Sequence, residues 1–472
     1  MFDEIFDGEG GCRSHYSKYL DWLKSCPSGH LQQKMIEADL MFRRIGITFA
    51  VYGEDEGAER LIPSDPVPRI ISAKEWEFLE RGLEQRVTAL NMFLHDIYHE
   101  GHIIKAGIIP ANKIYQNAQF QPCMMNLDLP NNIYSQICGV DLIRGADGNY
   151  YVLEDNLRVP SGVSYMLQNR RMSQYLFPEL FSKYQVAPVE HYPALLKQTL
   201  EDCSFSHTPT IAVLTPGPYN SAYYEHAFLA KEMGVELVEG RDLFIRDNKV
   251  WMHTIYGDKQ VDVLYRRIDD AFLDPLVLNP NSYLGVPGLI NAYRAGNVAI
   301  ANSLGTGVAD DKSIYPYVPQ MIKFYLDQEP ILQNVPTRIL SNPDDLKYTL
   351  ENLDKLVVKE VHGAGGYGML IGPTSTKAER ERFAEILKNK PEGYIAQPTI
   401  SLSTCGIWLD EDLTPRHIDL RPFVLSGSKV RITPGGLTRV ALTKGSLVVN
   451  SSQGGGTKDT WVLSEDSQNG GV

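Results

Sequence analysis

The sequence lacks the features of a membrane or secreted protein. Its 472 residues contain no apolar run close to the roughly 20 residues that a membrane-spanning helix needs. The opening stretch, MFDEIFDGEGG, is too acidic for a signal peptide. Six cysteines are scattered without a Cys-x-x-Cys pair, so neither a zinc ribbon nor a disulfide framework is indicated. We therefore expect a protein of the reducing cytoplasm with no membrane partner.

Positive charge is also scarce. The chain has 45 Lys and Arg residues against 58 Asp and Glu residues, which gives a net charge of −13. This balance argues against a general nucleic-acid binder, although it permits a local basic pocket. With 43% hydrophobic and 22% charged residues, the composition is that of an ordinary globular protein. The length exceeds that of one ordinary domain, so we expect more than one.

Local patterns predict an α/β (α+β) architecture. Residues 1–104 have a mainly helical pattern, in which Ser72 and Glu75 form a capping-box motif before apolar residues at helical spacing. A new unit begins near Pro188, where TIAVLTPGPYNSAYYEHAFLAKEMGVELVEG has the strand–turn–helix–strand order of a βαβ unit with a parallel sheet. From about Ala309, helix and strand patterns alternate again.

The segment VDLIRGADGNYYVLEDN has the pattern of a β-hairpin with several polar groups on one face. The Asp-Gly pair at 147–148 predicts a two-residue turn, which places Asp141 opposite Glu154 and Asn156 on the same face. Like charges directly opposite each other destabilise a sheet, so a bound cation would explain the pattern. Two alternatives stay open: the acids are solvated surface residues, or a longer turn breaks this register.

A glycine-rich loop occurs in DKLVVKEVHGAGGYGMLIGPTS. Gly363, Gly365 and Gly368 satisfy G-x-G-x-x-G, but a dinucleotide site needs a helix directly after the glycines, and the strand-like MLIG follows instead. We predict a loop between two strands, with Lys359 available to a phosphate at the end of the first strand. A flexible hairpin tip beside a surface lysine is equally compatible with the pattern. The chain has no H-R-D or D-F-G motif, which argues against a protein kinase.

The order of these motifs resembles the circularly permuted ATP-grasp family, which includes glutathionylspermidine synthase. The likeness covers residues from about 105 to 460, and the chain resembles the uncharacterised bacterial branch of that family. The lysine strand and the following HGAGGYGM resemble the lysine and the flap of that family. The segment EGYIAQPTIS resembles its adenine hinge, and HIDLRPFVLSG resembles its D-x-R strand. The segment GGLTRVAL contains an arginine that resembles its second arginine. An earlier lysine opens a helix in VADDKSIYPYVPQMIKFYL. The acidic hairpin resembles the magnesium set, and it precedes the lysine strand as the permuted order requires.

The resemblance implies a role for each of these motifs. Asp141, Glu154 and Asn156 are expected to bind Mg²⁺. Arg421 and Arg439 are expected to act catalytically by stabilising the transferring phosphoryl group, with Asp419 two residues before Arg421. The expected ATP-binding residues are Lys312, Lys359, Gly363, Gly365, Gly366, Gly368 and Gln397.

The resemblance also implies a domain order and an activity. The expected parts are a helical N-terminal region (1–104), a metal-binding part of the ATP-grasp fold (105–187), an inserted α/β substrate-side unit (188–308), a lysine and glycine-flap part (309–462) and a disordered tail (463–472). The implied activity is ATP- and Mg²⁺-dependent carbon–nitrogen ligation. A small-molecule or peptide carboxylate forms an acyl phosphate, which an amine co-substrate converts to an amide or peptide bond. An ATP-grasp phosphotransferase and an ATP-binding module without turnover are the alternatives.

Two charged clusters lie outside this scheme. HDIYHEGH contains His95, His99 and His102 but lacks the H-E-x-x-H order of a zinc helix. Histidines often stand at the C-terminal end of a helix, so we interpret this cluster as structural. YRRIDD contains Arg266 and Arg267, which either form surface ion pairs or bind a substrate carboxylate. The sequence leaves these two possibilities open.

Overall fold

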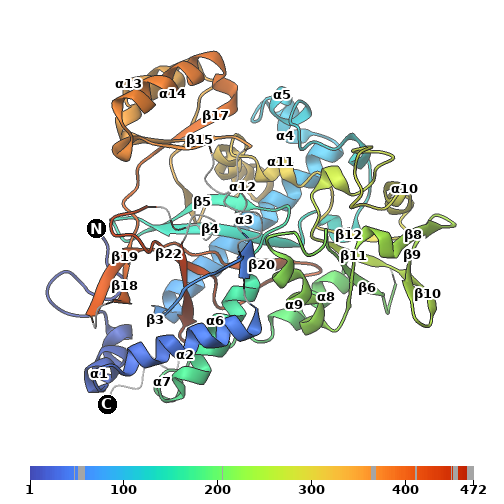
Figure 1. Cartoon of the computed structure of the whole chain (residues 1–472). Helices are drawn as coiled ribbons and strands as arrows, with labels where there is room; N and C mark the ends of the chain where they lie inside the picture. The colour runs from blue at the N-terminus through green and yellow to red at the C-terminus, as the bar shows by residue number, and fades with distance from the viewer. Residues whose placement is uncertain are drawn as a thin grey trace.

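The fold is given by a computed structural model that describes residues 1–46, 48–50, 59–204, 206–362, 368–409, 412–447, 449 and 455–464. Figure 1 shows a central mass that contains the N-terminal helices, an α/β unit on one side of it and a separate lobe above. None of the helices in the described ranges is long and apolar enough to span a membrane.

The N-terminal region combines helices with one long strand. The helices are α1 (Ser17–Ser25), α2 (His30–Ile45) and α3 (Ala73–Tyr98), and β3 (Ser64–Ile71) directly precedes α3. The predicted capping box is confirmed. Ser72 Oγ accepts a hydrogen bond from the Glu75 N–H, and the Glu75 carboxylate accepts one from the Ser72 N–H. The cap fixes the start of a helix whose apolar face is part of the main core.

Replacing Ser72 by Ala is expected to lower the free energy of unfolding by about 1 kcal/mol, because the Glu75 N–H loses its partner at the helix start. Urea unfolding measures this change. Ser72→Asp keeps an acceptor at the cap and is the matched control, for which we expect stability close to that of the wild type. An equal loss in the two variants would contradict the capping explanation.

The central sheet joins strands from distant parts of the chain. Its order is β13 (Gln333–Asn334), β5 (Tyr150–Asn156), β4 (Ile137–Arg144), β20 (Phe423–Ser426) and β21 (Val430–Ile432). The β4 strand pairs antiparallel with both β5 and β20. Helix α3 packs against β20 and β21, and its apolar side chains share one core with those of β4 and β5. The sheet therefore places the segment around residue 421 beside the predicted acidic hairpin.

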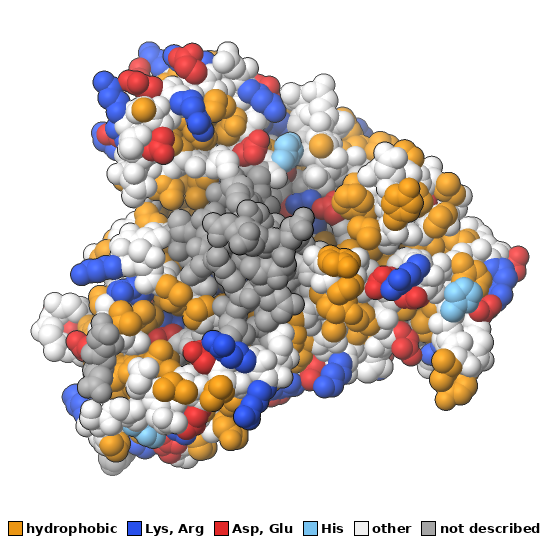
Figure 2. All heavy atoms as spheres, viewed as in Figure 1, with side chains coloured by type: hydrophobic (Ala, Val, Ile, Leu, Met, Phe, Trp, Pro, Cys, Tyr) orange, Lys and Arg blue, Asp and Glu red, His pale blue; other side chains and the backbone are white. Residues whose placement is uncertain are grey.

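A second sheet forms the lobe at the upper left of Figure 1. Its order is β14 (Arg338–Ile339), β17 (Tyr394–Pro398), β15 (Leu356–Glu360) and β16 (Leu370–Ile371), and it is accompanied by α13 (Pro343–Glu351) and α14 (Lys377–Asn389). The strand at MLIG and the later helix start are confirmed by β16 and α14. The lobe has its own small hydrophobic core. Charged side chains of both signs cover the face of the lobe seen in Figure 2.

The α/β unit contains a parallel sheet and an antiparallel meander. The parallel sheet has the order β12 (Ala299–Ala301), β11 (Val263–Arg266), β6 (Ile211–Leu214) and β7 (Glu236–Val238). Strand β6, helix α9 (Tyr223–Met233) and strand β7 follow in the expected order, and β6 pairs with β7 in parallel. The meander consists of β8 (Leu243–Arg246), β9 (Lys249–Thr254) and β10 (Gly257–Val261). Helices α8 (Tyr192–Glu201) and α10 (Leu289–Arg294) complete the unit.

A three-stranded sheet connects early and late parts of the chain. Its order is β22 (Thr438–Val440), β23 (Gly456–Val462) and β3, and β23 runs parallel to β3. Two further ladders pair β18 (Thr404–Leu409) with β19 (Asp412–His417) and β1 (Thr48–Ala50) with β2 (Glu59–Leu61). Other helices are α4 (His102–Lys105), α5 (Ala111–Tyr115), α6 (Val163–Leu176), α7 (Pro178–Lys183), α11 (Gly307–Asp310) and α12 (Val318–Leu326).

Candidate functional site

The acidic hairpin has the predicted pairing but not the predicted turn. Asp141 on β4 lies opposite Glu154 on β5. The connection between the strands covers residues 145–149, so the two-residue turn is wrong, and the register near the turn differs by one residue. A bulge at Leu153 inserts one extra residue and restores the pairing of the two acids. The pairing of Asp141 with Glu154 is therefore confirmed, although the turn length on which it rested is not.

Asp141 is buried between two arginines. Arg421 donates to both of its carboxylate oxygens, through Nε and through Nη2 at 2.7 Å. Arg439 on β22 donates to Asp141 Oδ2 through Nη2, also at 2.7 Å. Burial by itself would raise the pKa of Asp141, but the two guanidinium groups hold that pKa well below its ordinary value. Asp141 is therefore a carboxylate that holds two arginine side chains in place.

Asp419 extends this network. Arg439 Nε lies 2.9 and 3.0 Å from the two carboxylate oxygens of Asp419, which is buried. Burial raises the pKa of Asp419, and Arg439 opposes that rise. Asp419 and Arg421 are two residues apart, and their side chains both turn towards the Asp141–Arg439 pair. The predicted D-x-R segment therefore supplies one carboxylate, Asp419, and one guanidinium group, Arg421, to a single network.

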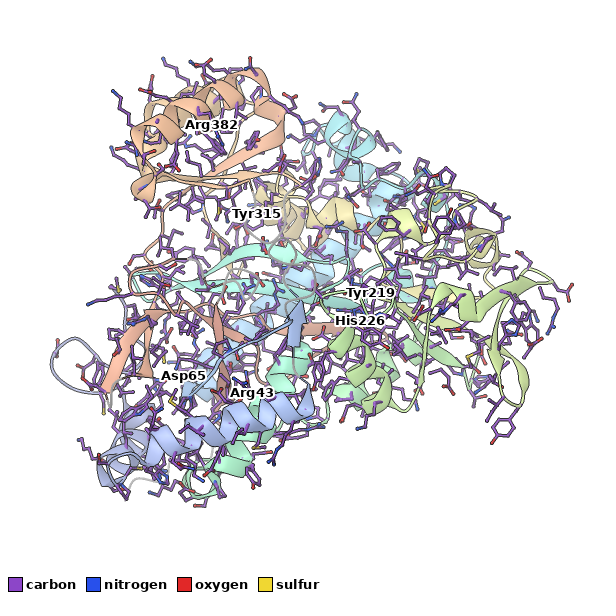
Figure 3. All side chains as sticks on the ribbon, viewed as in Figure 1. Arg43, Asp65, Tyr219, His226, Tyr315 and Arg382 are labelled. Carbon is purple, nitrogen blue, oxygen red and sulfur yellow. The ribbon has the colours of Figure 1, made fainter. Side chains whose placement is uncertain are left out.

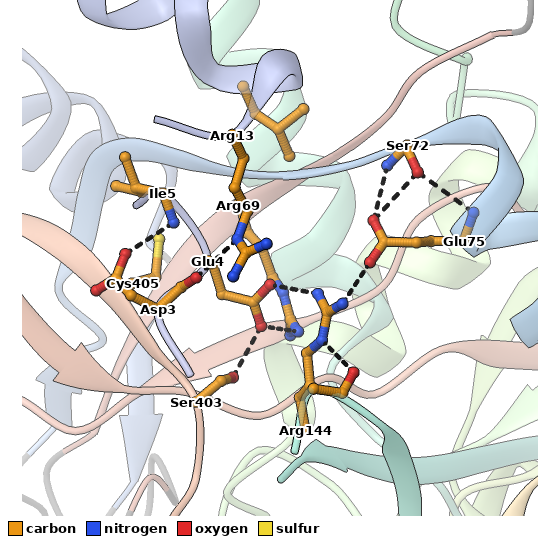
Figure 4. A network of polar contacts seen from close by, with 12 residues as sticks. Asp3, Glu4, Ile5, Arg13, Arg69, Ser72, Glu75, Arg144, Ser403 and Cys405 are labelled. Atoms are coloured by element: carbon orange, nitrogen blue, oxygen red, sulfur yellow. Dashed lines mark hydrogen bonds and ion pairs between the residues drawn. The ribbon is translucent and has the colours of Figure 1, made fainter. Parts of the chain in front are cut away.

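A separate polar network holds Arg144 at the end of β4 (Figure 4). Glu4 is buried and accepts hydrogen bonds from Arg69 at 2.8 Å, Arg144 at 2.9 Å and Ser403 at 2.8 Å. Arg69 also donates to the backbone carbonyl of Asp419 at 3.2 Å. Burial would raise the pKa of Glu4, but Arg69 and Arg144 hold it below its ordinary value. Glu4 and Arg69 thus link the end of β4 to the backbone of the D-x-R segment.

Glu154, Asn156 and Lys359 lie at the open side of this network. The Glu154 carboxylate is 31% exposed, and its oxygens lie 3.9 Å from Lys312 Nζ and from Arg421 Nη2. The Nδ2 atom of Asn156 is buried and has no hydrogen-bond partner among the described residues. Lys359 comes from β15 of the other sheet. Burial lowers the pKa of Lys359, and Glu154 opposes that shift.

A cavity of about 510 Å³ is lined by residues of both sheets, and it is of the size that holds a small-molecule ligand. Its apolar walls include Ile143 and Leu153 of the central sheet, and Val357 and Ile371 of the lobe. The predicted site residues on its lining are Asp141, Glu154, Asn156, Lys312, Lys359, Gln397, Asp419, Arg421 and Arg439. The structure therefore brings these distant motifs to one cavity.

The structure describes the predicted hinge residue Gln397 but only part of the predicted glycine-rich flap. Gln397 lies on β17, is buried and donates from Nε2 to Thr337 Oγ1 at 2.9 Å. Gly363, Gly365 and Gly366 lie outside the described residues. Gly368 is described, and its φ of +69° is a conformation that favours glycine.

The sequence interpretation missed several polar residues of the cavity wall. Arg158 lies on the lining together with Asp310 and Asp311. Arg158 Nε donates to Asp310 at 2.8 Å, and its Nη1 donates to Asp269 at 2.9 Å. The signal that could have found Arg158 is its position two residues after Asn156 on the same strand end. The two aspartates precede Lys312 directly, so they could have been found with it.

The structure places the two clusters that lie outside the ATP-grasp scheme, the histidine cluster and YRRIDD. The rings of His95 and His99 lie 4.1 Å apart, and His102 contacts Asp96 at 3.1 Å. In the part of the chain that is described, no group of three or more His, Cys, Asp and Glu side chains could hold a metal ion. The predicted metal ligands on the hairpin are only two acids, Asp141 and Glu154, together with the amide of Asn156.

Arg266 and Arg267 are buried, so the interpretation of YRRIDD as a surface ion-pair run is wrong.

Comparison with known proteins shows the family. The sequence profile of circularly permuted ATP-grasp type 2 proteins matches residues 68–441, and the chain belongs to this family. An uncharacterised protein of Synechocystis sp. is 49% identical over 472 residues, covering 99% of this chain and 98% of that protein. An uncharacterised protein of Mycobacterium tuberculosis is 48% identical over 465 residues, covering 98% and 84%.

Two further matches are a relative that carries the name of a ligase and a solved structure with a similar fold. A Frankia casuarinae protein that is provisionally named a glutamate–cysteine ligase is 42% identical over 466 residues. The match covers 98% of this chain but 53% of the Frankia protein, so this chain corresponds to about half of that relative. The structure of a glutathione synthetase-like effector from Globodera pallida aligns with a TM-score of 0.57 and 11% identity, covering 93% of this chain and 99% of that one. At this identity the likeness concerns the fold alone.

Proposed function

We propose that the protein is an ATP- and Mg²⁺-dependent ligase that joins a carboxylate to an amine through an acyl phosphate. Family membership supports ATP binding, and the ligase name of the Frankia relative supports the reaction class. The observation that carries the proposal is the convergence of four cationic side chains with Glu154 and Asn156 on one cavity. In this proposal the α/β unit is inserted between the two ATP-grasp parts and forms the substrate side.

The charges of the site suit a phosphate chain that is bound together with a divalent cation. Five cationic and seven anionic side chains line the cavity, so with His362 neutral the lining has a net charge of −2 (5 − 7); the cations are Arg158, Lys312, Lys359, Arg421 and Arg439, and the anions are Asp141, Glu154, Asp155, Asp310, Asp311, Glu360 and Asp419. A nucleoside triphosphate brings several negative charges, and a divalent cation would offset part of them. The apolar residues between the two sheets offer a slot for the base, and Gln397 lies on the same lining.

The hairpin fits Mg²⁺ in its chemistry. Carboxylate and amide oxygens are ligands that Mg²⁺ accepts, and the unpartnered Nδ2 of Asn156 indicates that this amide is not oriented by a protein partner. Glu154 and Asn156 would hold the ion, and Asp141 could add an oxygen that still has a lone pair. When bound, Mg²⁺ would neutralise charge on the β- and γ-phosphate oxygens.

The residues of the chain would support two chemical steps. In the first, a carboxylate oxygen of the substrate attacks the γ-phosphorus, the bond to the bridging oxygen of ADP breaks, and an acyl phosphate forms. Lys312 and Lys359 would hold the phosphates, while Arg421 and Arg439 would stabilise the transferring phosphoryl group. In the second, the amine attacks the acyl carbon, phosphate leaves and the nitrogen loses a proton. The cavity walls would keep water away from the acyl phosphate.

Product analysis tests this proposal. The protein is incubated with ATP, Mg²⁺, pooled amino acids and other small carboxylates, and pooled amines including polyamines. We expect ADP and phosphate to be released in equal amounts only when both an acid and an amine are present. Transfer of phosphate without an amine would indicate a phosphotransferase. Binding of ATP without any release would indicate a module without turnover, and either result would overturn the ligase proposal.

ATP affinity is expected to fall as pH rises above neutrality. Lys359 binds phosphate only in its charged form, and burial lowers its pKa, so the charge is lost at a lower pH than for an ordinary lysine. Isothermal titration across the alkaline range measures the dependence, and binding should take up protons where Lys359 is partly neutral. Lys359→Arg keeps the charge and should flatten the profile over the same range. An unchanged profile in that variant would remove Lys359 from the phosphate site.

A further inference from the structure

Two adjacent arginines at the end of β11 make different contacts. Arg266 pairs with Asp270 at 2.6 Å and donates to the backbone carbonyls of Asn302 at 2.6 Å and Ser303 at 3.0 Å. Arg267 reaches the segment that follows the acidic hairpin instead. Nothing in the proposed mechanism uses Arg267, although its side chain is buried and charged.

Arg267 and Glu225 hold the start of α6 from two sides. Arg267 donates to the Pro160 carbonyl at 2.7 Å and to Ser161 Oγ at 2.6 Å. It also forms an ion pair with Glu225 Oε1 at 3.0 Å. The other carboxylate oxygen of Glu225 accepts from the N–H groups of Gly162 at 2.8 Å and of residue 164 at 3.0 Å. Glu225 therefore caps α6 from α9, and Arg267 binds the residues just before the cap.

The held segment is part of the cavity and touches the phosphoryl-transfer arginine. Pro160, Ser161 and Gly162 all line the cavity. The Ser161 carbonyl accepts a hydrogen bond from Arg421 Nη1 at 3.2 Å. A Cβ atom added at Gly139 would lie 3.1 Å from Pro160 and 3.2 Å from Arg421, so these three residues are closely packed. A displacement of the segment would therefore move Arg421 against its neighbours.

We propose that Arg267 and Glu225 are positioning residues for phosphoryl transfer: they hold the segment 160–164 so that the Ser161 carbonyl and the packing of Pro160 orient Arg421. This inference rests on the proposed ligase function. The pair lies on the α/β unit, so it makes the geometry of the phosphoryl site depend on the placement of that unit. Neither residue is among those that line the cavity.

The pair is enclosed by buried polar groups. Glu225 is buried beside Arg267, and Arg267 also donates to the Tyr265 hydroxyl at 2.9 Å. His226, the next residue on α9 and labelled in Figure 3, stays neutral because burial and then Arg267 lower its pKa to about 2. His226 bonds to the Thr215 hydroxyl at 2.9 Å. The ion pair is therefore not disturbed by protonation of this neighbour near neutral pH.

Steady-state kinetics of matched variants test the proposal. Arg267→Lys keeps the charge but not the planar fork that reaches four acceptors, so we expect kcat for ADP release to fall about tenfold to 100-fold. The KM for ATP should change less than about threefold, because the phosphate lysines and the apolar slot are unaltered. The control is Arg170→Lys, which alters an equally buried arginine paired with Asp459 at 3.1 Å, away from the cavity. That control should keep the wild-type kcat.

Hydrogen exchange gives a readout independent of turnover. Glu225→Gln removes the charged acceptor of the Gly162 and Ser164 amides, so exchange of these two amides should become faster, while Arg170→Lys should leave them protected. Equal loss of kcat in Arg267→Lys and Arg170→Lys, or unchanged exchange in Glu225→Gln, would overturn the proposal. If the wild type releases no ADP under any condition, the ligase function fails and the positioning role fails with it. The exchange result then still decides whether the pair holds the segment.

Discussion

Replacing Glu154 by Gln is expected to abolish Mg²⁺-dependent ADP release, with a loss of about 100-fold or more in rate. Glu154 is the more accessible of the two paired acids, at 31% exposure against 1% for Asp141, and an amide oxygen without negative charge binds Mg²⁺ far less well. The melting temperature without ligand should be unchanged or higher, because Glu154 lies directly opposite the buried Asp141 and like charges repel. A coupled ADP assay and calorimetry measure the two quantities.

The control for this variant is Asp147→Asn, which neutralises an exposed acid in the loop of the same hairpin. Asp147 lies outside the cavity lining, so its neutralisation should leave ADP release at the wild-type rate. Full activity in Glu154→Gln would remove the metal assignment. A large drop in melting temperature would show instead that Lys312 and Arg421, which lie 3.9 Å from Glu154, need its charge for folding.

Several local features of the fold follow from the sequence alone. The capping box at Ser72 and the late helix start at Lys377 are short-range signals, in which a few adjacent residues determine the backbone. The predicted Asp141–Glu154 pairing is also found, but only because two differences cancel: the longer turn shifts the register by one residue, and the bulge at Leu153 shifts it back. The bulge at Leu153 has no such signal, since an apolar residue in a bulge has the same sequence appearance as one in a regular strand.

The long-range contacts of the site could not be predicted in the same way. Asp141 is 280 residues from Arg421 and 298 residues from Arg439, and no local pattern specifies that a hairpin acid will be enclosed by two late arginines. Motif order places all three at an ATP site but leaves open which atoms pair. The YRRIDD segment shows the same limit. A run of charges is typical of a surface, and only the position of Arg266 at the end of a central parallel strand explains its burial.

The buried Asp141 gives the largest expected effect on stability. Replacing Asp141 by Asn should lower the free energy of unfolding at neutral pH by about 3 kcal/mol or more, because Arg421 and Arg439 lose a buried counter-charge. Urea unfolding measures this loss. The control is Asp258→Asn, which breaks an exposed pair with Arg246 at 2.9 Å and should change stability little.

The pH dependence of the stability difference between the wild type and Asp141→Asn tests whether the arginine pairing causes that difference. The folded-state pKa of Asp141 is held below its unfolded value of 3.8, so its contribution is fully present above that value and is lost as pH falls towards the folded pKa. The gap between wild type and Asp141→Asn should therefore be constant near neutrality and narrow below about pH 4. A loss no larger than that of Asp258→Asn, or a gap independent of pH in the acid range, would contradict the arginine pairing. If the stability difference narrows at acid pH as expected, Asp141 holds Arg421 and Arg439 in place without nucleotide. Glu154 and Asn156 then remain at the open side of the network for a metal ion and phosphates.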